Sequence, residues 1–322
     1  MEKTKSINMK SILKWCQNNI NLVILILMII IGALMSDAFL SLSNLMNLFR
    51  RVAINGIMAI GFTMTLLIGG FDLSIGSTLS MGAVFAVGIS NTTGSYVAGI
   101  AVALLSGILM GFLNGYMMKL TRGGSGEAFL ITMATSFIGT AIALTYCKGL
   151  DLYAKNPPQW YRNIGMGEVL GFPVAALIWI ILMVIFQLII KKTKLGRRMI
   201  LCGANPSSAF LVGVDVGKLK ILGFTIAGFL AAISGIILTA RTTAGGPNSG
   251  AGGDFDAAIA SIIGGNSLVG GHGGMIQVFI GTLIYGLITN ILNLGGVESA
   301  VQYIVKGAVL LLAICLDNLK ER

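Results

Sequence analysis

The residues with the greatest capacity for chemistry are the nine from Gly69 to Ser77, which read Gly-Gly-Phe-Asp-Leu-Ser-Ile-Gly-Ser and follow an apolar stretch. A charge at the centre of a bilayer costs roughly 2.5 to 3.5 kcal/mol or more unless it is shielded. Irregular backbone at that depth is tolerated only where it is buried in protein or lines a watery cavity. We therefore expect that Asp72 or Ser74 caps the next helix, and the alternatives for Asp72 are a role in gating or dimer contacts and direct binding of the solute.

A second glycine-rich stretch matches the first. Each has Ile-Gly-Gly, then a short polar run, then a further glycine: Gly69, Gly70, Asp72, Ser74 and Gly76 in the first, and Gly264, Gly265, Asn266, Ser267 and Gly270 in the second. Both are expected to join an inward-running span to an outward-running one, which makes them parallel copies in an internal repeat. We also expect the second stretch to be the partner of the first. Internal duplication is common in transporters, although short glycine-rich matches also arise by chance. For His272, in the second stretch, we expect a structural or surface role.

The basic loop 191–220 carries the third pattern. Asn205 suits the N-cap of a helix, Pro206 suits its first position and Gly213 suits its end, so the sequence predicts a short helix from Pro206 to Val212. The apolar side chains that follow Ala209 favour a docking element for a cytoplasmic partner. The alternative is an ordinary juxtamembrane helix held by anionic lipid.

Scattered polar residues within the apolar stretches form a fourth group. Hydroxyl and amide side chains can hydrogen-bond a solute along a hydrophilic path, and they can equally join one helix to another. The residues that could line such a path are Asn55, Asn114, Thr132, Thr135 and Asn290. Lys306 also falls inside an apolar stretch, where we expect it to pair with a carbonyl or carboxylate group or to extend toward the interface.

The elements that carry these residues are membrane helices. The chain is 55% hydrophobic and 11% charged with a mean hydropathy of +0.89, and about 20 apolar residues cross a bilayer as a helix. We predict an all-α polytopic membrane protein, one domain over 1–322 with about ten transmembrane helices, the eighth too short to cross as a straight helix. The expected spans are 20–38, 52–69, 76–92, 96–118, 127–147, 172–190, 221–240, 256–265, 275–293 and 299–316.

Charge sets the expected orientation. Most of the 22 Lys and Arg residues fall in 1–19, 119–126, 191–220 and 317–322, and such residues accumulate in cytoplasmic segments. The expectation is a multi-pass membrane protein with both termini in the cytoplasm, a cytoplasmic loop at 191–220 and a loop at 148–171 on the opposite side. The net charge of +10 then needs no nucleic acid, and the single histidine cannot form a multi-histidine metal site.

Four motifs in order resemble the permease subunits of ribose-type ABC sugar importers, from about Leu40 to Asp317. They are the first glycine stretch, the Gly-Arg-Arg to Gly-Val loop, the second glycine stretch with the preceding Asp256-Ala-Ala-Ile-Ala, and Lys306-Gly-Ala near the end. The sequence departs from that family at His272, where a basic residue is usual, and at Asn266, where a small hydroxyl residue is usual. Branched-chain amino acid permeases share the general plan, but the two glycine stretches fit the sugar permeases better.

The resemblance implies a multi-pass permease of the bacterial inner membrane, with 148–171 as a periplasmic loop. It would form a homodimer and work with a cytoplasmic ATP-binding subunit and an extracytoplasmic sugar-binding protein. ATP and Mg²⁺ would bind to the partner ATPase, and this chain would hold no cofactor. The residues that match the family's ATPase-coupling loop are Arg197, Arg198, Asn205, Pro206, Ala209, Phe210 and Gly213.

Two other classes of function are weighed against the permease. An ion-coupled secondary transporter of a small polar solute would want a carboxylate within the membrane, whereas the carboxylates here fall near predicted span ends. A membrane enzyme is disfavoured because the sequence has no His-Glu-x-x-His, Gly-x-Ser-x-Gly or Walker A motif.

Overall fold

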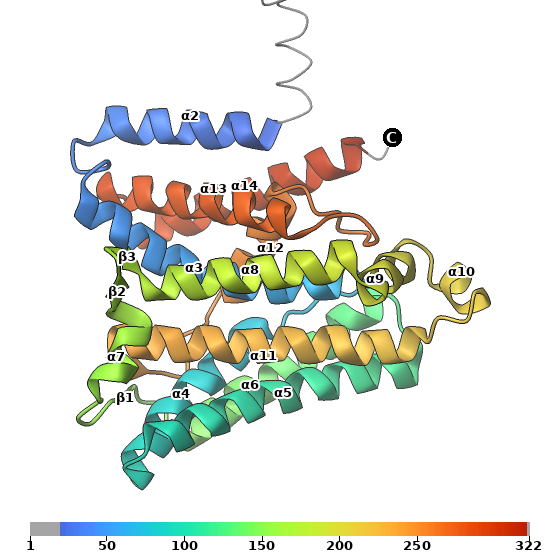
Figure 1. Cartoon of the computed structure of the whole chain (residues 1–322), viewed down its shortest axis with the longest axis horizontal. Helices are drawn as coiled ribbons and strands as arrows, with labels where there is room; N and C mark the ends of the chain where they lie inside the picture. Colours follow the sequence, from blue (N-terminus) through green and yellow to red (C-terminus); the bar gives the residue numbers. More distant parts are fainter. Residues whose placement is uncertain (1–19, 321–322) are drawn as a thin grey trace, which may run out of the picture.

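The protein is seen in a computed structural model that describes residues 20–320. The predicted cytoplasmic segment 1–19 lies outside these residues. Helices run side by side along the long axis of the molecule, with the short helices α9 and α10 at one end and α7 at the other (Figure 1). The longer helices are α2 (Ile20–Met35), α3 (Leu42–Leu66), α4 (Ile75–Thr93), α5 (Tyr96–Thr121), α6 (Ser125–Cys147), α8 (Val174–Lys192), α11 (Val216–Thr242), α12 (Gly253–Ile263), α13 (Met275–Leu294) and α14 (Ser299–Lys320).

Each predicted span overlaps one of these helices. Five of them, α5, α6, α8, α11 and α13, are long and apolar enough to cross a membrane, and α2 is a shorter apolar helix. A polytopic, mainly helical membrane protein is therefore confirmed, while the number of crossings stays a prediction. The eighth predicted span is indeed short, since α12 has 11 residues.

The start of the second predicted span is wrong. The span was expected from residue 52, but α3 begins at Leu42, where the Ser41 hydroxyl accepts a hydrogen bond from the backbone N–H of Asn44. The added turns carry Asn44, Arg50 and Arg51, so their low hydropathy hid them. A good N-cap and a polar first section predict a helix that extends beyond its apolar part.

The helices pack closely around α11, which contacts α3, α4 and α5. Three glycines of α5 at helical spacing face α11, and a Cβ on Gly115 would lie 2.5 Å from the Ile221 Cα atom. A Cβ on Gly107 would lie 2.7 Å from the Ala232 Cβ atom. These glycines let the two backbones approach, as small residues do between membrane helices.

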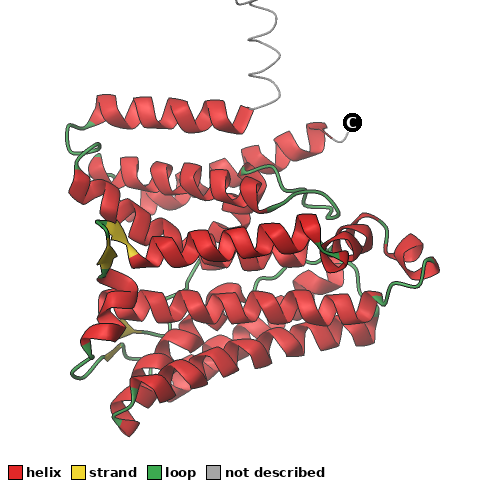
Figure 2. Cartoon of the chain, viewed as in Figure 1, coloured by secondary structure: helices red, strands yellow, loops and turns green. Residues whose placement is uncertain are grey.

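Short strands gather at the end opposite α10 (Figure 2). Strand β1 (Leu152–Tyr153) pairs with β4 (Ala244–Gly245), and β2 (Glu168–Val169) pairs with β3 (Phe172–Pro173), both antiparallel. The short helix α7 (Gln159–Met166) lies between β1 and β2 in sequence. The guanidinium of Arg50 holds this segment in place by pairing with Glu168 at 2.6 Å. The expected all-α fold is thus correct apart from these strand pairs.

Candidate functional site

Helices α9 (Lys194–Ala204) and α10 (Pro206–Leu211) form the end of the molecule that the basic loop was expected to build. The Asn205 side chain accepts a hydrogen bond from the backbone N–H of Ser208 at 2.9 Å, and Pro206 occupies the first turn. Gly213 takes a positive φ of 79°, which suits a residue without a Cβ just after a helix. The predicted helix is confirmed with its end one residue earlier than expected.

The apolar residues of α10 divide between two sides. Phe210, Leu211 and the following Val212 are 72%, 83% and 69% exposed, whereas Ala209 is fully buried. Of the residues that match the coupling loop, Ala209 therefore packs into the protein and Phe210 faces outward. The guanidinium side chains of Arg197 and Arg198 are exposed on α9.

A cleft of about 930 Å³ separates α10 from the nearby ends of α5 and α11. Phe210 and Leu211 contribute apolar walls, and Lys119 and Arg122 contribute positive charge. The backbone N–H of Lys218 and its side chain keep the pKa of Asp215, on the same rim, below its ordinary value. This surface combines exposed apolar side chains with cations, which suits a protein partner more than bulk water.

Gly203, near the end of α9, packs against both glycine stretches. A Cβ on Gly203 would clash with the Leu67 carbonyl oxygen and would lie 2.6 Å from the Gly271 nitrogen. A Cβ on Gly270 would lie 2.8 Å from the Leu66 carbonyl oxygen and 3.0 Å from the Gly69 Cα atom. We call this three-way contact the glycine junction: Gly69, Gly203, Gly270 and Gly271. The predicted pairing of the two glycine stretches is confirmed.

The second stretch is closed on itself by Asn266. Its amide donates to the carbonyl oxygen and to the hydroxyl of Ser261, each at 3.1 Å, and its oxygen accepts from the Gly274 N–H at 2.7 Å. Ser261 in turn shares a hydrogen bond of 2.8 Å with Thr63 of α3. Asn266 thus spans a loop that a serine or threonine is too short to close, and His272 lies exposed at the turn.

Asp72 lies in a buried polar network. Its carboxylate accepts from the Ser74 N–H at 2.8 Å and from the Ser74 hydroxyl at 2.6 Å. The Asn114 amide donates to the Ser74 hydroxyl at 2.7 Å, and the Thr135 hydroxyl donates to the Asn114 oxygen at 2.6 Å. Ser74 is the N-cap residue of α4, but neither side chain caps that helix directly. Asp72 instead fixes the turn that leads into α4.

The five polar residues expected along a path separate into groups. Asn114 and Thr135 belong to the Asp72 network, and the Thr132 hydroxyl beside it accepts from the Leu73 N–H at 3.0 Å. Asn290 exchanges hydrogen bonds with Asn44, and Asn55 is half-buried on α3. In this conformation four of the five join segments of the protein to one another, as hydrogen-bonding groups between membrane helices do.

Lys306 pairs with the carboxylate of Asp256, and a carboxylate was one of its expected partners. The ammonium lies 3.0 Å and 3.2 Å from the two carboxylate oxygens, and it also lies over the rings of Tyr285 and Tyr303. Asp256 is in the first turn of α12, where Gly253 is buried and Phe255 is exposed. The residues just before it pack on α4, where the Gly250 N–H donates to the Ser80 hydroxyl at 2.8 Å.

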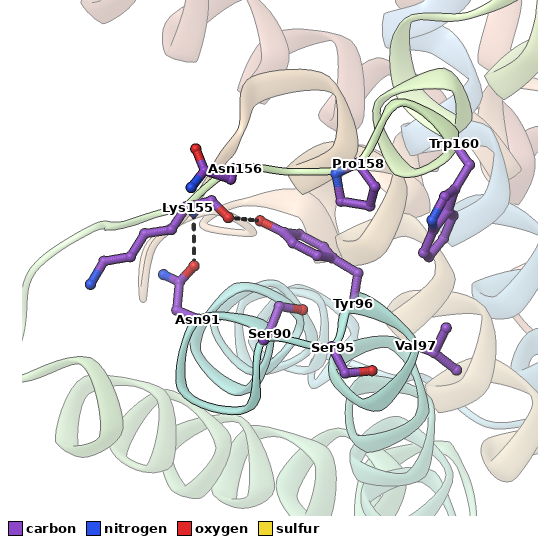
Figure 3. Close-up of a pocket in the computed structure, with 10 residues that line it drawn as sticks. Ser90, Asn91, Ser95, Tyr96, Val97, Lys155, Asn156, Pro158 and Trp160 are labelled. Carbon is purple, nitrogen blue, oxygen red and sulfur yellow. Dashed lines mark hydrogen bonds between the residues drawn. The ribbon is translucent and has the colours of Figure 1, made fainter.

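A second cleft of about 560 Å³ opens at the α7 end, between the α4–α5 turn and the loop before α7. The Tyr96 hydroxyl donates to the Lys155 carbonyl oxygen, and the Asn91 side chain bonds the backbone of Tyr153 and Lys155 (Figure 3). Trp160 forms one side. Sequence reasoning missed this cleft, although aromatic residues beside polar ones after a span are a known interfacial signal.

Among the side chains that the structure describes, no three His, Cys, Asp or Glu groups gather where they could hold a metal ion. The buried thiol of Cys202, next to the glycine junction, has a pKa raised by burial, which keeps it neutral. The chemistry available at these sites is hydrogen bonding, ion pairing and close backbone contact.

Comparison with known proteins agrees with the geometry. Residues 44–314 match the family model described as branched-chain amino acid transport system / permease component. The chain is 35% identical over 297 residues to the ribose import permease protein RbsC of Bacillus subtilis, covering 92% of this chain and 91% of that protein.

Two further relatives come from Escherichia coli. Its ribose import permease protein RbsC is 33% identical over 310 residues, covering 95% of each chain. Its L-arabinose transport system permease protein AraH is 31% identical over 301 residues, covering 94% of this chain and 90% of that protein. No solved structure matches the chain. Matched along nearly its whole length, the chain belongs to the family of ABC transporter permease components that includes these relatives.

Proposed function

We propose that this protein is the transmembrane subunit of an ATP-binding cassette importer and moves a monosaccharide or a sugar-like solute into the cell. The names of its relatives support a pentose-type solute. We infer that the α10 end and both termini face the cytoplasm, because the segments 1–19, 119–126, 191–220 and 317–322 hold most of the basic residues of the sequence.

The observation that carries this proposal is the outward face of α10. Three consecutive apolar residues, Phe210 to Val212, stand exposed beside a basic cleft. Large apolar groups exposed together on a rigid surface mark sites of interaction. The occupant is a cytoplasmic ATPase subunit, which binds ATP and Mg²⁺, since this sequence has no Walker A motif of its own.

The proposed importer has two further partners. An extracytoplasmic binding protein delivers the solute to the α7 end, and a second copy of the chain completes the path across the membrane. The Asp72 network holds the turn before α4 during this cycle. The permease itself hydrolyses nothing.

The docking proposal is tested with Phe210→Asp and Leu211→Asp. Each places a carboxylate on the apolar face without touching the buried Ala209, so the fold should survive while co-purification of the ATPase falls. Desolvating a charge in an interface that has no matching partner costs several kcal/mol, so at least a tenfold loss of binding is expected. The matched control is Leu170→Asp, a fully exposed leucine at the opposite end, which should leave ATPase binding unchanged.

Unchanged ATPase binding in both α10 variants, with folded protein and normal uptake, would sink the docking assignment. Loss of binding to vesicles rich in anionic lipid, with ATPase binding retained, would identify α10 as a lipid anchor instead. The solute itself is identified by measuring sugar binding to the cognate binding protein by calorimetry. A preference for amino acids over all sugars would contradict the proposed substrate class.

A further inference from the structure

The geometry points to Gly203 and Gly271 as the positioning residues that carry a displacement of α10 to the membrane helices. This inference rests on the proposed function, in which an ATPase docked on α10 moves that helix. It names the contact through which the movement reaches the membrane helices. Gly203 lies on α9, and Gly271 lies in the second glycine stretch, between α12 and α13.

Helices α9 and α10 are held as one short unit. The Asn205 N–H donates to the Leu201 carbonyl oxygen and its side chain caps α10, so a single residue both ends one helix and begins the next. The Val214 N–H returns to the Ala209 carbonyl oxygen at 3.0 Å, on the buried side of α10. A push on Phe210 or Leu211 therefore moves α9 as well.

At the glycine junction this unit touches backbone directly. A Cβ on Gly203 would clash with the Leu67 carbonyl oxygen, and a Cβ on Gly271 would lie 2.5 Å from the Ala204 Cα atom. The atoms that these two Cβ positions would meet first belong to the main chain and to the Ala204 methyl group, none of which can change rotamer to absorb a shift. Close-packed interiors have low compressibility and transmit strain, so main chain pressed on main chain passes a movement on.

The junction reaches two helix pairs together. Leu67 directly follows α3 and leads into the turn of Asp72 and α4, whereas Gly271 lies between α12 and α13. Gly270 packs against Gly69, which joins the two stretches. The same two pairs meet again inside the molecule, where the Gly250 N–H donates to the Ser80 hydroxyl. These contacts, with the hydrogen bond between Ser261 of α12 and Thr63 of α3, fix the two pairs to each other, so they should move as one.

The test is Gly203→Ala in the complete transporter, reconstituted in liposomes with its ATPase and binding protein. The methyl group separates α9 from the junction, so the ATPase should still bind and hydrolyse ATP. The solute imported per ATP should fall roughly 3- to 30-fold, the range by which residues along a coupling route alter coupling. A merely structural role would lower protein yield and leave that ratio alone.

Two controls isolate the position. Gly228→Ala is matched in crowding, since its Cβ would clash with the Gly107 carbonyl oxygen and lie 2.9 Å from the Gly111 nitrogen, but it belongs to the α5–α11 contact. It should reduce the amount of folded protein without changing solute per ATP. Gly126→Ala, with nothing within 4 Å of its Cβ, should match the native protein in the amount of folded protein and in solute imported per ATP.

The native complex supplies a second measurement that needs no variant. Hydrogen–deuterium exchange with and without a trapped ATP analogue should change together in 66–70, 199–204 and 268–272. A change confined to 199–213, or a wild-type ratio of solute to ATP in folded Gly203→Ala, would overturn the inference. Failure of the native complex to import anything with ATP would instead overturn the proposed function.

Discussion

Replacing Lys306 by methionine should destabilise the folded protein by about 3 kcal/mol, because the Asp256 carboxylate would lose its cation inside the helix packing. The ammonium lies 3.0 Å from one carboxylate oxygen, and the two side chains are only 23% and 17% exposed. The Tyr285 and Tyr303 rings, with centroids 5.4 Å and 5.6 Å away, shield the cation further.

The magnitude follows from this partial burial. Removing one member of a buried ion pair costs about 3 to 5 kcal/mol, and the remaining solvent contact places this pair at the lower end. The double variant Lys306→Met with Asp256→Asn removes both charges, so it should recover roughly 2 kcal/mol of that loss. The single variants and the double variant form a cycle that isolates the interaction.

The free energy of unfolding can be measured in mixed micelles titrated with sodium dodecyl sulfate, with helix content followed by circular dichroism. The matched control is Lys218→Met, because the pair of Lys218 and Asp215 has a similar separation of 3.2 Å but is 77% and 51% exposed. That change should cost under about 0.5 kcal/mol. The reasoning is refuted if Lys306→Met costs no more than the control, or if the double variant loses the sum of the two single losses.

Two further outcomes are expected. Asn114→Leu should cost about 1 to 3 kcal/mol of unfolding free energy, since Ser74 and Thr135 lose their shared partner in a buried site, and an effect no larger than that of Thr135→Val would contradict the network. Burial raises the pKa of Tyr161 to about 12 while its hydroxyl shares a hydrogen bond with Thr239. The unfolded chain loses this proton first, so stability should fall between about pH 10 and 12. Tyr161→Phe should remove that part of the fall, and an unchanged pH profile would count against it.

Local signals in the sequence were sufficient for the elements that they control. Asn205, Pro206 and Gly213 each act on the backbone within a few residues, so their cap and stop preferences predicted α10 almost to the residue. The spacing of the glycines on α5 is typical of a close helix contact, and such a contact exists with α11. Hydropathy located the apolar part of every span but missed the polar first turns of α3.

Contacts between distant segments could not be predicted in this way. Asp72, Asn114 and Thr135 were each identified, yet nothing in their spacing showed that they share one network, because helix rotation decides which faces meet. The same limit applies to Ala209, whose burial depends on how α10 rests against α9. The pairing of Lys306 was expected, but its partner depended on how α12 packs against α14.

The most direct test of the account is solute uptake by proteoliposomes that contain the permease with and without its partners. The account predicts no uptake by the permease alone under any ion gradient, and ATP-dependent uptake of a sugar once the ATPase and the binding protein are added. Uptake driven by a proton or sodium gradient in the absence of the ATPase would contradict it and would identify a secondary transporter.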